Sequence, residues 1–127
     1  MRALVTGGAG FIGSHLVDRL VANGDEVTVI DNLSSGVIEF IQGHIDTGAV
    51  SFHNVDLKDL DLVKPIMSGI DMVYHLAANP DIRLGTRITD TDLKEGTIVT
   101  YNVLESMRLA GVEKIAFASS SVVYGED

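Results

Sequence analysis

The chain has 127 residues, which suits one domain with a buried core, and its 46% hydrophobic and 21% charged residues are the proportions of a globular protein. It contains no cysteine, which excludes disulfides, thiolate metal sites and cysteine nucleophiles, and we expect a cytoplasmic protein. Nine basic and eighteen acidic residues give a net charge of −9, so we do not expect nucleic acid as a partner, and no segment approaches the about eighteen apolar residues of a membrane helix.

In chain order, strand-like and helix-like segments alternate with short connections. Runs rich in β-branched residues predict strands over residues 3–6, 26–30, 50–54, 72–75 and 114–119. Apolar residues at helical spacing predict helices over residues 11–23, 57–67 and 93–110. Asn23-Gly24 is a typical stop for the first helix.

Strands that alternate with helices predict βαβ units, in which helices cover both faces of a parallel sheet. Right-handed crossovers then favour a Rossmann-like, doubly wound α/β fold with strand order 3-2-1-4-5. Because the chain contains no repeat, linker or low-complexity tract, we expect residues 1–127 to form one domain.

A glycine-rich turn joins the first strand to the first helix. Gly8, Gly10 and Gly13 match the pattern G-x-G-x-x-G, with a predicted strand before it and an amphipathic helix after it. Glycines allow a sharp turn and a close approach of the backbone to a pyrophosphate, and the helix N-terminus offers N–H groups and partial positive charge. The sequence therefore predicts a dinucleotide site that attracts an anion despite the acidic net charge.

Two acidic residues follow later strands. Asp31 lies eighteen residues beyond Gly13, where a carboxylate accepts hydrogen bonds from a ribose 2′-hydroxyl and repels a 2′-phosphate, so we expect NAD rather than NADP. Asp56-Leu57 follows the third strand, at the sheet edge where adenine binds in such folds. Asp56 is equally suited to be the N-cap of the next helix, and the two interpretations stay open.

Four segments carry a resemblance to a known family. They are Thr-Gly-Gly-Ala-Gly-Phe-Ile-Gly-Ser over residues 6–14, Asp-Asn-Leu-Ser-Ser-Gly over 31–36, His-Leu-Ala-Ala over 75–78 and Ser-Ser-Ser-Val-Val-Tyr-Gly over 119–125. Together, and in this order, they resemble the extended short-chain dehydrogenase/reductase family, in its NAD-dependent epimerase/dehydratase branch of nucleotide-sugar enzymes. The resemblance spans the whole chain.

The resemblance implies NAD as cofactor and a UDP-sugar as substrate of the parent enzyme. It places the pyrophosphate on Phe11-Ile12, the adenosine ribose on residues 31–36, adenine on Asp56-Leu57 and nicotinamide beside residues 76–80. Together with the glycine turn, the expected cofactor-binding residues are Gly7, Gly10, Phe11, Ile12, Gly13, Asp31, Asn32, Leu33, Ser34, Ser35, Gly36, Asp56, Leu57, Leu76, Ala77, Ala78 and Asn79.

The serine segment is expected to carry the chemistry. In the resembling family, a Ser or Thr four residues before the Tyr-Gly pair bonds the reacting sugar hydroxyl, which gives Ser120, with Ser119 and Ser121 as alternatives. Dehydratases and decarboxylases place Glu two residues before this Tyr, and dehydratases often add Asp three residues before it. Val122 and Ser121 occupy these positions here, so the resemblance favours an epimerase.

The chain departs from the family pattern in two ways. The family's base is the Tyr of a Tyr-x-x-x-Lys pair, and none of Tyr74, Tyr101 and Tyr124 has Lys four residues later. We therefore expect a chain that ends before the substrate-binding part and is inactive alone. A non-catalytic NAD-binding module and a bare folding fragment are the alternatives. Gly96 stands where the family usually has an Asn that contacts the cofactor.

Two further expectations concern packing. The 93–110 helix is apolar nearly all round, which predicts burial on more than one side and a homodimer through this helix. The four histidines, His15, His44, His53 and His75, share no ligand spacing, so no metal site is expected. His75 is expected to be a packed residue at the end of the fourth strand.

Overall fold

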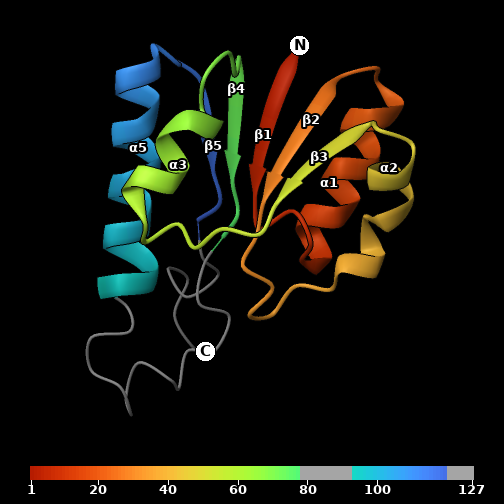
Figure 1. Ribbon diagram of the computed structural model, residues 1–127, viewed down its shortest axis with the longest axis horizontal. Helices are drawn as coiled ribbons and strands as arrows, with labels where there is room; N and C mark the ends of the chain where they lie inside the picture. The colour runs from red at the N-terminus through yellow and green to blue at the C-terminus, as the bar shows by residue number, and fades with distance from the viewer. Residues whose placement is uncertain (78–92, 120–127) are drawn as a thin grey trace, which may run out of the picture.

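The computed structural model describes residues 1–77 and 93–119, which are built around one five-stranded sheet (Figure 1). The strands are β1 (Arg2–Thr6), β2 (Glu26–Ile30), β3 (Val50–His53), β4 (Met72–His75) and β5 (Ile115–Phe117). Their order is β3-β2-β1-β4-β5, and every neighbouring pair is parallel. The predicted Rossmann-like α/β fold with strand order 3-2-1-4-5 is therefore confirmed.

Helices cover both faces of this sheet. α1 (Phe11–Ala22) and α2 (Gln42–Asp46), which follows the 3₁₀ turn η1 (Ile38–Phe40), lie on one side, and α3 (Leu60–Ile66) and α5 (Val99–Ala110) lie on the other (Figure 1). In β1, Leu4 belongs to the core beneath α3 and α5, whereas Ala3 and Val5 belong to the core beneath α1. Successive side chains of a strand point to opposite faces, so a central strand that is apolar at every position needs both layers.

The first helix ends as its sequence predicts. Gly24 has a left-handed φ of +84°, and its N–H donates to the carbonyl of Val21, while the N–H of Asp25 donates to the carbonyl of Leu20. This pair of hydrogen bonds is the Schellman arrangement, which satisfies carbonyls that the helix end leaves open. Glycine fits this position because it has no Cβ to oppose a positive φ.

The other two predicted helices differ from expectation at their N-terminal ends. The helix expected over 57–67 begins only at Leu60, because the backbone carbonyl of Asp56 accepts the N–H of Asp59 in a separate turn. The helix expected over 93–110 starts as a π-helix, η2 (Leu93–Ile98), before α5. Gly96 lies in this π segment, and a Cβ built there would meet no atom within 4 Å.

The apolar character of α5 divides between two faces. Val99, Val103 and Met107 are buried against the sheet and α3, as expected for a core-facing stripe. Tyr101 and Leu104 remain 58% and 47% exposed. Within the described part of the chain, therefore, only one apolar face of this helix is covered.

The carboxyl ends of all five strands lie at one edge of the sheet (Figure 1). In doubly wound sheets, ligands bind outside this edge, near the point where the strand order reverses. That point lies here between β1 and β4. No helix in residues 1–77 or 93–119 is long and apolar enough to cross a membrane.

Candidate functional site

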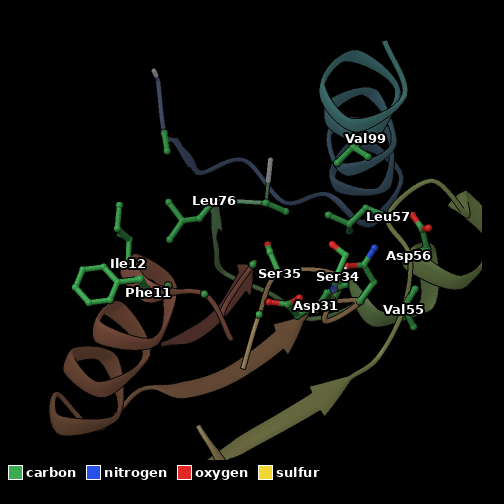
Figure 2. A pocket seen from close by; sticks show the side chains of 18 residues that line it. Phe11, Ile12, Asp31, Ser34, Ser35, Val55, Asp56, Leu57, Leu76 and Val99 are labelled. Carbon is green, nitrogen blue, oxygen red and sulfur yellow. Dashed lines mark hydrogen bonds between the residues drawn. The ribbon is translucent and has the colours of Figure 1, made fainter. Parts of the chain in front are cut away.

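A cavity of about 510 Å³ opens at the carboxyl edge of the sheet. In Figure 2, Phe11 and Ile12 lie at one end, Asp31 and two serines in the middle, and Leu57 and Val99 at the other end. The full lining consists of Gly7, Gly10, Phe11, Ile12, Gly13, Ile30, Asp31, Asn32, Ser34, Ser35, Gly36, Val55, Asp56, Leu57, Leu76, Ala77, Val99 and Ala118.

The structure brings nearly all of the expected cofactor residues together in this one cavity. Of the described residues named for that role, Leu33 alone is absent from the lining. Its side chain packs instead on the core beneath α1, and its φ of +61° turns the chain back toward the cavity at Ser34. The assignment of Leu33 to the cofactor site stays a prediction. Ala78 and Asn79 lie outside the described residues.

Four lining residues were missed by the sequence analysis: Ile30, Val55, Val99 and Ala118. Ile30 and Ala118 carry a signal that could have found them, because each lies at the carboxyl end of a strand or just after it. Val99 carries none, because it comes from a helix far along the chain.

The glycine turn, residues 7–13, has no room for side chains at its centre. Gly7 has a φ of +71°, and a Cβ there would lie 2.9 Å from the backbone nitrogen of Ala77. A Cβ on Gly13 would collide with the carbonyl oxygen of Gly7. The N–H of Gly10 donates to that same carbonyl at 3.1 Å, so the turn folds tightly onto itself.

Gly8 differs from the other glycines of the motif. A Cβ on it would meet the side chain of Val29 in β2 at 2.7 Å, so this residue faces the sheet and not the cavity. The glycines of the turn that line the cavity are Gly7, Gly10 and Gly13. The G-x-G-x-x-G match thus included one core-packing glycine. The collision at Gly13 is with backbone atoms of the turn itself.

The N-terminus of α1 points into this end of the cavity. Its first turn contains no acidic residue, and no side chain caps it. The first N–H groups of an α-helix have no partner within the helix and carry partial positive charge. Phe11 and Ile12, at 75% and 70% exposure, flank this end. The arrangement suits an anionic group such as a pyrophosphate.

Asp31 holds two parts of the cavity wall. One carboxylate oxygen accepts the N–H of Ala9 in the glycine turn at 3.0 Å, and the other accepts the N–H of Leu33 at 2.8 Å. Gly36 lies against the same carboxylate, where a Cβ would come within 2.9 Å of an oxygen. A carboxylate oxygen can accept more than one hydrogen bond, so Asp31 keeps capacity for hydroxyl groups in the cavity.

Asp56 is not a helix cap. Its side chain accepts the N–H of Lys58 at 2.9 Å, in a turn that precedes the helix, and α3 follows Asp59. Of the two open interpretations, the N-cap is therefore wrong for this residue. Asp56 and Leu57 both line the cavity, at the end opposite Phe11 (Figure 2).

His75 is buried in a hydrogen-bonded network beneath the cavity. Its Nδ1 lies 2.7 Å from the hydroxyl of Thr6, and its Nε2 lies 3.3 Å from the hydroxyl of Thr100. The Thr6 oxygen accepts the N–H groups of Leu76 and Ala77, so its own hydrogen is the one available for Nδ1. His75 is thus a neutral imidazole that carries its hydrogen on Nε2 and donates it to Thr100.

Burial of His75 lowers its pKa from 6.5 to about 4, because the charged form loses its solvation. The ring also lies 5.7 Å from that of Phe117. The expectation of a packed residue at the end of β4 is confirmed. Through Thr6, this histidine helps to hold the backbone at Leu76 and Ala77, which line the cavity.

The catalytic residues expected in the serine segment are not placed by the structure. Ser120 and Ser121 lie outside the described residues, and Ser119 is exposed and not part of the cavity lining. Within residues 1–77 and 93–119, no three His, Asp or Glu side chains lie close enough together to hold a metal ion.

A glycine turn at a helix N-terminus, an acidic residue at the end of β2 and a cavity at the topological switch point are the features of dinucleotide-binding α/β proteins. The model of the NAD dependent epimerase/dehydratase family matches residues 3–127. The chain belongs to this family, whose cofactor is NAD.

Three proteins to which the chain is similar are named as enzymes that act on UDP-sugars. A crystal structure of a UDP-galactose 4-epimerase is 51% identical with a TM-score of 0.85, covering 98% of this chain and 40% of that one. The Thermus thermophilus UDP-glucose 4-epimerase, solved with NAD, is 41% identical with a TM-score of 0.84, covering 94% and 38%. UDP-glucuronic acid decarboxylase 1 of Danio rerio is 40% identical over 98% of this chain and 28% of its own length. The chain thus spans well under half the length of these relatives.

Proposed function

We propose that this chain is the NAD-binding part of a UDP-glucose/UDP-galactose 4-epimerase, and that it works in galactose metabolism in the cytoplasm. The cavity carries the proposal, because it joins the glycine turn, the α1 N-terminus and Asp31 in one continuous site. The similarity to two 4-epimerases supports the choice of reaction.

At the glycine turn, the absence of side chains leaves room for the phosphates of NAD. A Cβ at Gly7 or Gly13 would strike backbone atoms, so the turn leaves its N–H groups open to a phosphate. We assign the pyrophosphate to this turn and to Phe11-Ile12, and the adenosine ribose to Asp31 and residues 32–36. The adenine lies in the end lined by Val55, Asp56 and Leu57, and the nicotinamide beside Leu76 and Ala77.

Bound NAD would supply reversible hydride transfer at the sugar C4. The part of this chain in that reaction is to bind and orient. Ser120, or one of its neighbours Ser119 and Ser121, is assigned by resemblance to hold the reacting hydroxyl. Thr6 and His75 hold the backbone of Leu76-Ala77 beneath the nicotinamide end.

A decarboxylase is the nearest competing function, since relatives with that name are as similar as several epimerases. The residues before Tyr124 favour the epimerase. Val122 stands two residues before it, where decarboxylases and dehydratases of the family place Glu, and an apolar side chain cannot act as an acid or base.

We also propose a homodimer that buries the exposed face of α5. Tyr101 and Leu104 project from this face, whereas Met107 is buried in the core. Tyr101→Glu is therefore the variant that should separate the subunits without unfolding them. Light scattering on a size-exclusion column should give a dimer for the unmodified chain and a monomer for the variant.

The test of the proposed function uses the full-length gene product. It should interconvert UDP-glucose and UDP-galactose with bound NAD and release no carbon dioxide from UDP-glucuronate. Decarboxylation without epimerisation would replace the proposal. A product that binds NAD but converts neither sugar would favour a non-catalytic NAD-binding module.

A further inference from the structure

Asn102 is a buried polar residue in the interior of α5, and its side chain reaches the cavity wall. The residue is 4% exposed, and its amide nitrogen Nδ2 donates to the backbone carbonyl of Leu57 at 2.8 Å. Leu57 lines the cavity at the end opposite the glycine turn. One hydrogen bond thus joins two segments that lie 45 residues apart in sequence.

The segment that receives this hydrogen bond has little regular structure of its own. Residues 54–59, the β3–α3 loop, lie between the end of β3 and the start of α3. The backbone hydrogen bonds formed inside this loop are local ones, from Lys58 and Asp59 to Asp56. They shape the turn but do not fix its distance from α5. The hydrogen bond from Asn102 ties the loop to α5, together with the apolar packing of Leu57 in the core that contains Val99.

The same helix face also supplies Val99, which lies one turn before Asn102 and lines the cavity. Figure 2 shows Val99 and Leu57 at the same end of the cavity. Residues three apart on a helix project from one side, so a hydrogen bond at Asn102 also places Val99 relative to the β3–α3 loop. Val55 lies at the same end (Figure 2), so this end offers apolar side chains against which an aromatic base can pack.

Asn is a poor helix former, so it lowers the stability of a helix interior. Burial also removes water from its amide group, which costs further free energy unless protein atoms replace the lost hydrogen bonds. Ser106, one turn later on the same buried face, is a polar residue whose side chain lacks such a hydrogen bond among the residues that the structure describes. Its hydroxyl oxygen is buried and has no hydrogen-bond partner in the described part of the chain. Asn102 differs from Ser106 because its partner belongs to the cavity wall.

We propose that Asn102 is a positioning residue for the base of the nucleotide: it holds Leu57 at the separation from Val99 that receives the adenine ring. The inference rests on the proposed function, since it takes the cavity to be the NAD site. The residue that positions Leu57 thus belongs to α5, a helix that contributes no residue to the glycine turn.

The test compares two truncations on one helix face. Asn102→Ala removes the hydrogen bond to Leu57, whereas Ser106→Ala removes a buried hydroxyl that has no hydrogen-bond partner in the described chain. Each variant of the 127-residue chain is titrated calorimetrically with AMP and with nicotinamide mononucleotide. Asn102→Ala should weaken AMP about tenfold, the equivalent of about 1.4 kcal/mol, and leave nicotinamide mononucleotide within about twofold. Ser106→Ala should change neither.

A role confined to folding would give a different result. Equal losses for both ligands, or no loss for AMP, would overturn the inference. If Asn102→Ala does not fold, Asn102→Asp takes its place, because it keeps the shape and replaces the donor by an acceptor, and the same selective loss is expected. An unmodified chain that does not bind NAD would instead refute the proposed function. Normal NAD binding with unaltered AMP affinity in the variants would refute only the role of Asn102.

Discussion

The two ends of the cavity are built by different physical means. At the glycine turn, backbone atoms contact backbone atoms, and the positions of Gly7 and Gly13 leave no space for a Cβ. At the β3–α3 loop, the wall is held by a side-chain hydrogen bond from Asn102 and by apolar contacts from α5. The first end is defined by steric exclusion and tolerates almost no change, whereas the second can adjust when a contact is lost.

The strongest test of this difference is Gly13→Ala. The added Cβ would strike the carbonyl of Gly7, so the turn must shift and its N–H groups move away from the phosphate position. We expect a loss of about 3 kcal/mol in the free energy of unfolding and at least about a 100-fold loss of NAD affinity. Urea unfolding and calorimetric titration measure the two effects.

Gly43→Ala is the matched control, because Gly43 lies in α2 and a Cβ there meets no atom within 4 Å. It should leave NAD affinity unchanged and slightly stabilise the helix, since alanine is the better helix former. If the two variants had the same free energy of unfolding and the same NAD affinity, the turn would have room for a Cβ at Gly13.

The second prediction concerns the network that holds Leu76 and Ala77. Because the pKa of His75 is lowered from 6.5 to about 4, the unfolded chain binds this proton more readily than the folded chain. Protonation of His75 therefore does not reduce the free energy of unfolding above pH 6.5. As the pH falls toward about 4, it reduces that free energy by about 3 kcal/mol in total. Urea unfolding between these pH values measures the loss. His75→Gln should remove most of this part of the pH dependence; an unaltered pH profile would show that His75 does not cause it.

The third prediction separates two tasks of Asp31. Asp31→Asn keeps one oxygen that can accept an N–H, whereas Asp31→Ala removes both acceptors for Ala9 and Leu33. Both variants should narrow the preference for NAD over NADP, because the charge that repels a 2′-phosphate is gone. Only Asp31→Ala should also lower stability substantially, by about 2 kcal/mol. If NADP affinity does not rise relative to NAD in either variant, the carboxylate does not set cofactor preference.

The smallest expected effect is a gain. Ser106→Ala removes a buried hydroxyl that has no partner in the described chain, and alanine is the better helix former. We expect the free energy of unfolding to rise by about 1 kcal/mol, seen as a higher urea midpoint without a change in slope. A fall in stability would reveal a hydrogen bond to Ser106 outside the described residues.

The same contrast explains what the sequence could predict. The glycine turn and Asp31 follow directly after their strands, and strand order alone brings them together, so local spacing sufficed to find them. Asn102 and Val99 lie on a helix where nothing in the spacing distinguishes a cavity-facing residue from a core residue. Their role depends on how α5 packs on the sheet, and that is a tertiary property.

Local conformation accounts for two differences from expectation: Leu33 is absent from the cavity lining, and Asp56 is not a helix cap. Leu33 adopts a positive φ that an isolated sequence gives little reason to expect of a leucine, and its side chain turns toward the core beneath α1. Asp56 stands before a helix-like run, but its side chain closes a turn with Lys58, and the helix starts later. In both cases short-range hydrogen bonds decided the conformation.

The NAD preference of the proposed site can be measured by calorimetric titration of the unmodified 127-residue chain with NAD and with NADP. We predict one site for NAD and much weaker binding of NADP, because the Asp31 carboxylate lies beside the proposed ribose position and repels a 2′-phosphate. Equal affinities for the two cofactors, or no binding of either, would contradict it.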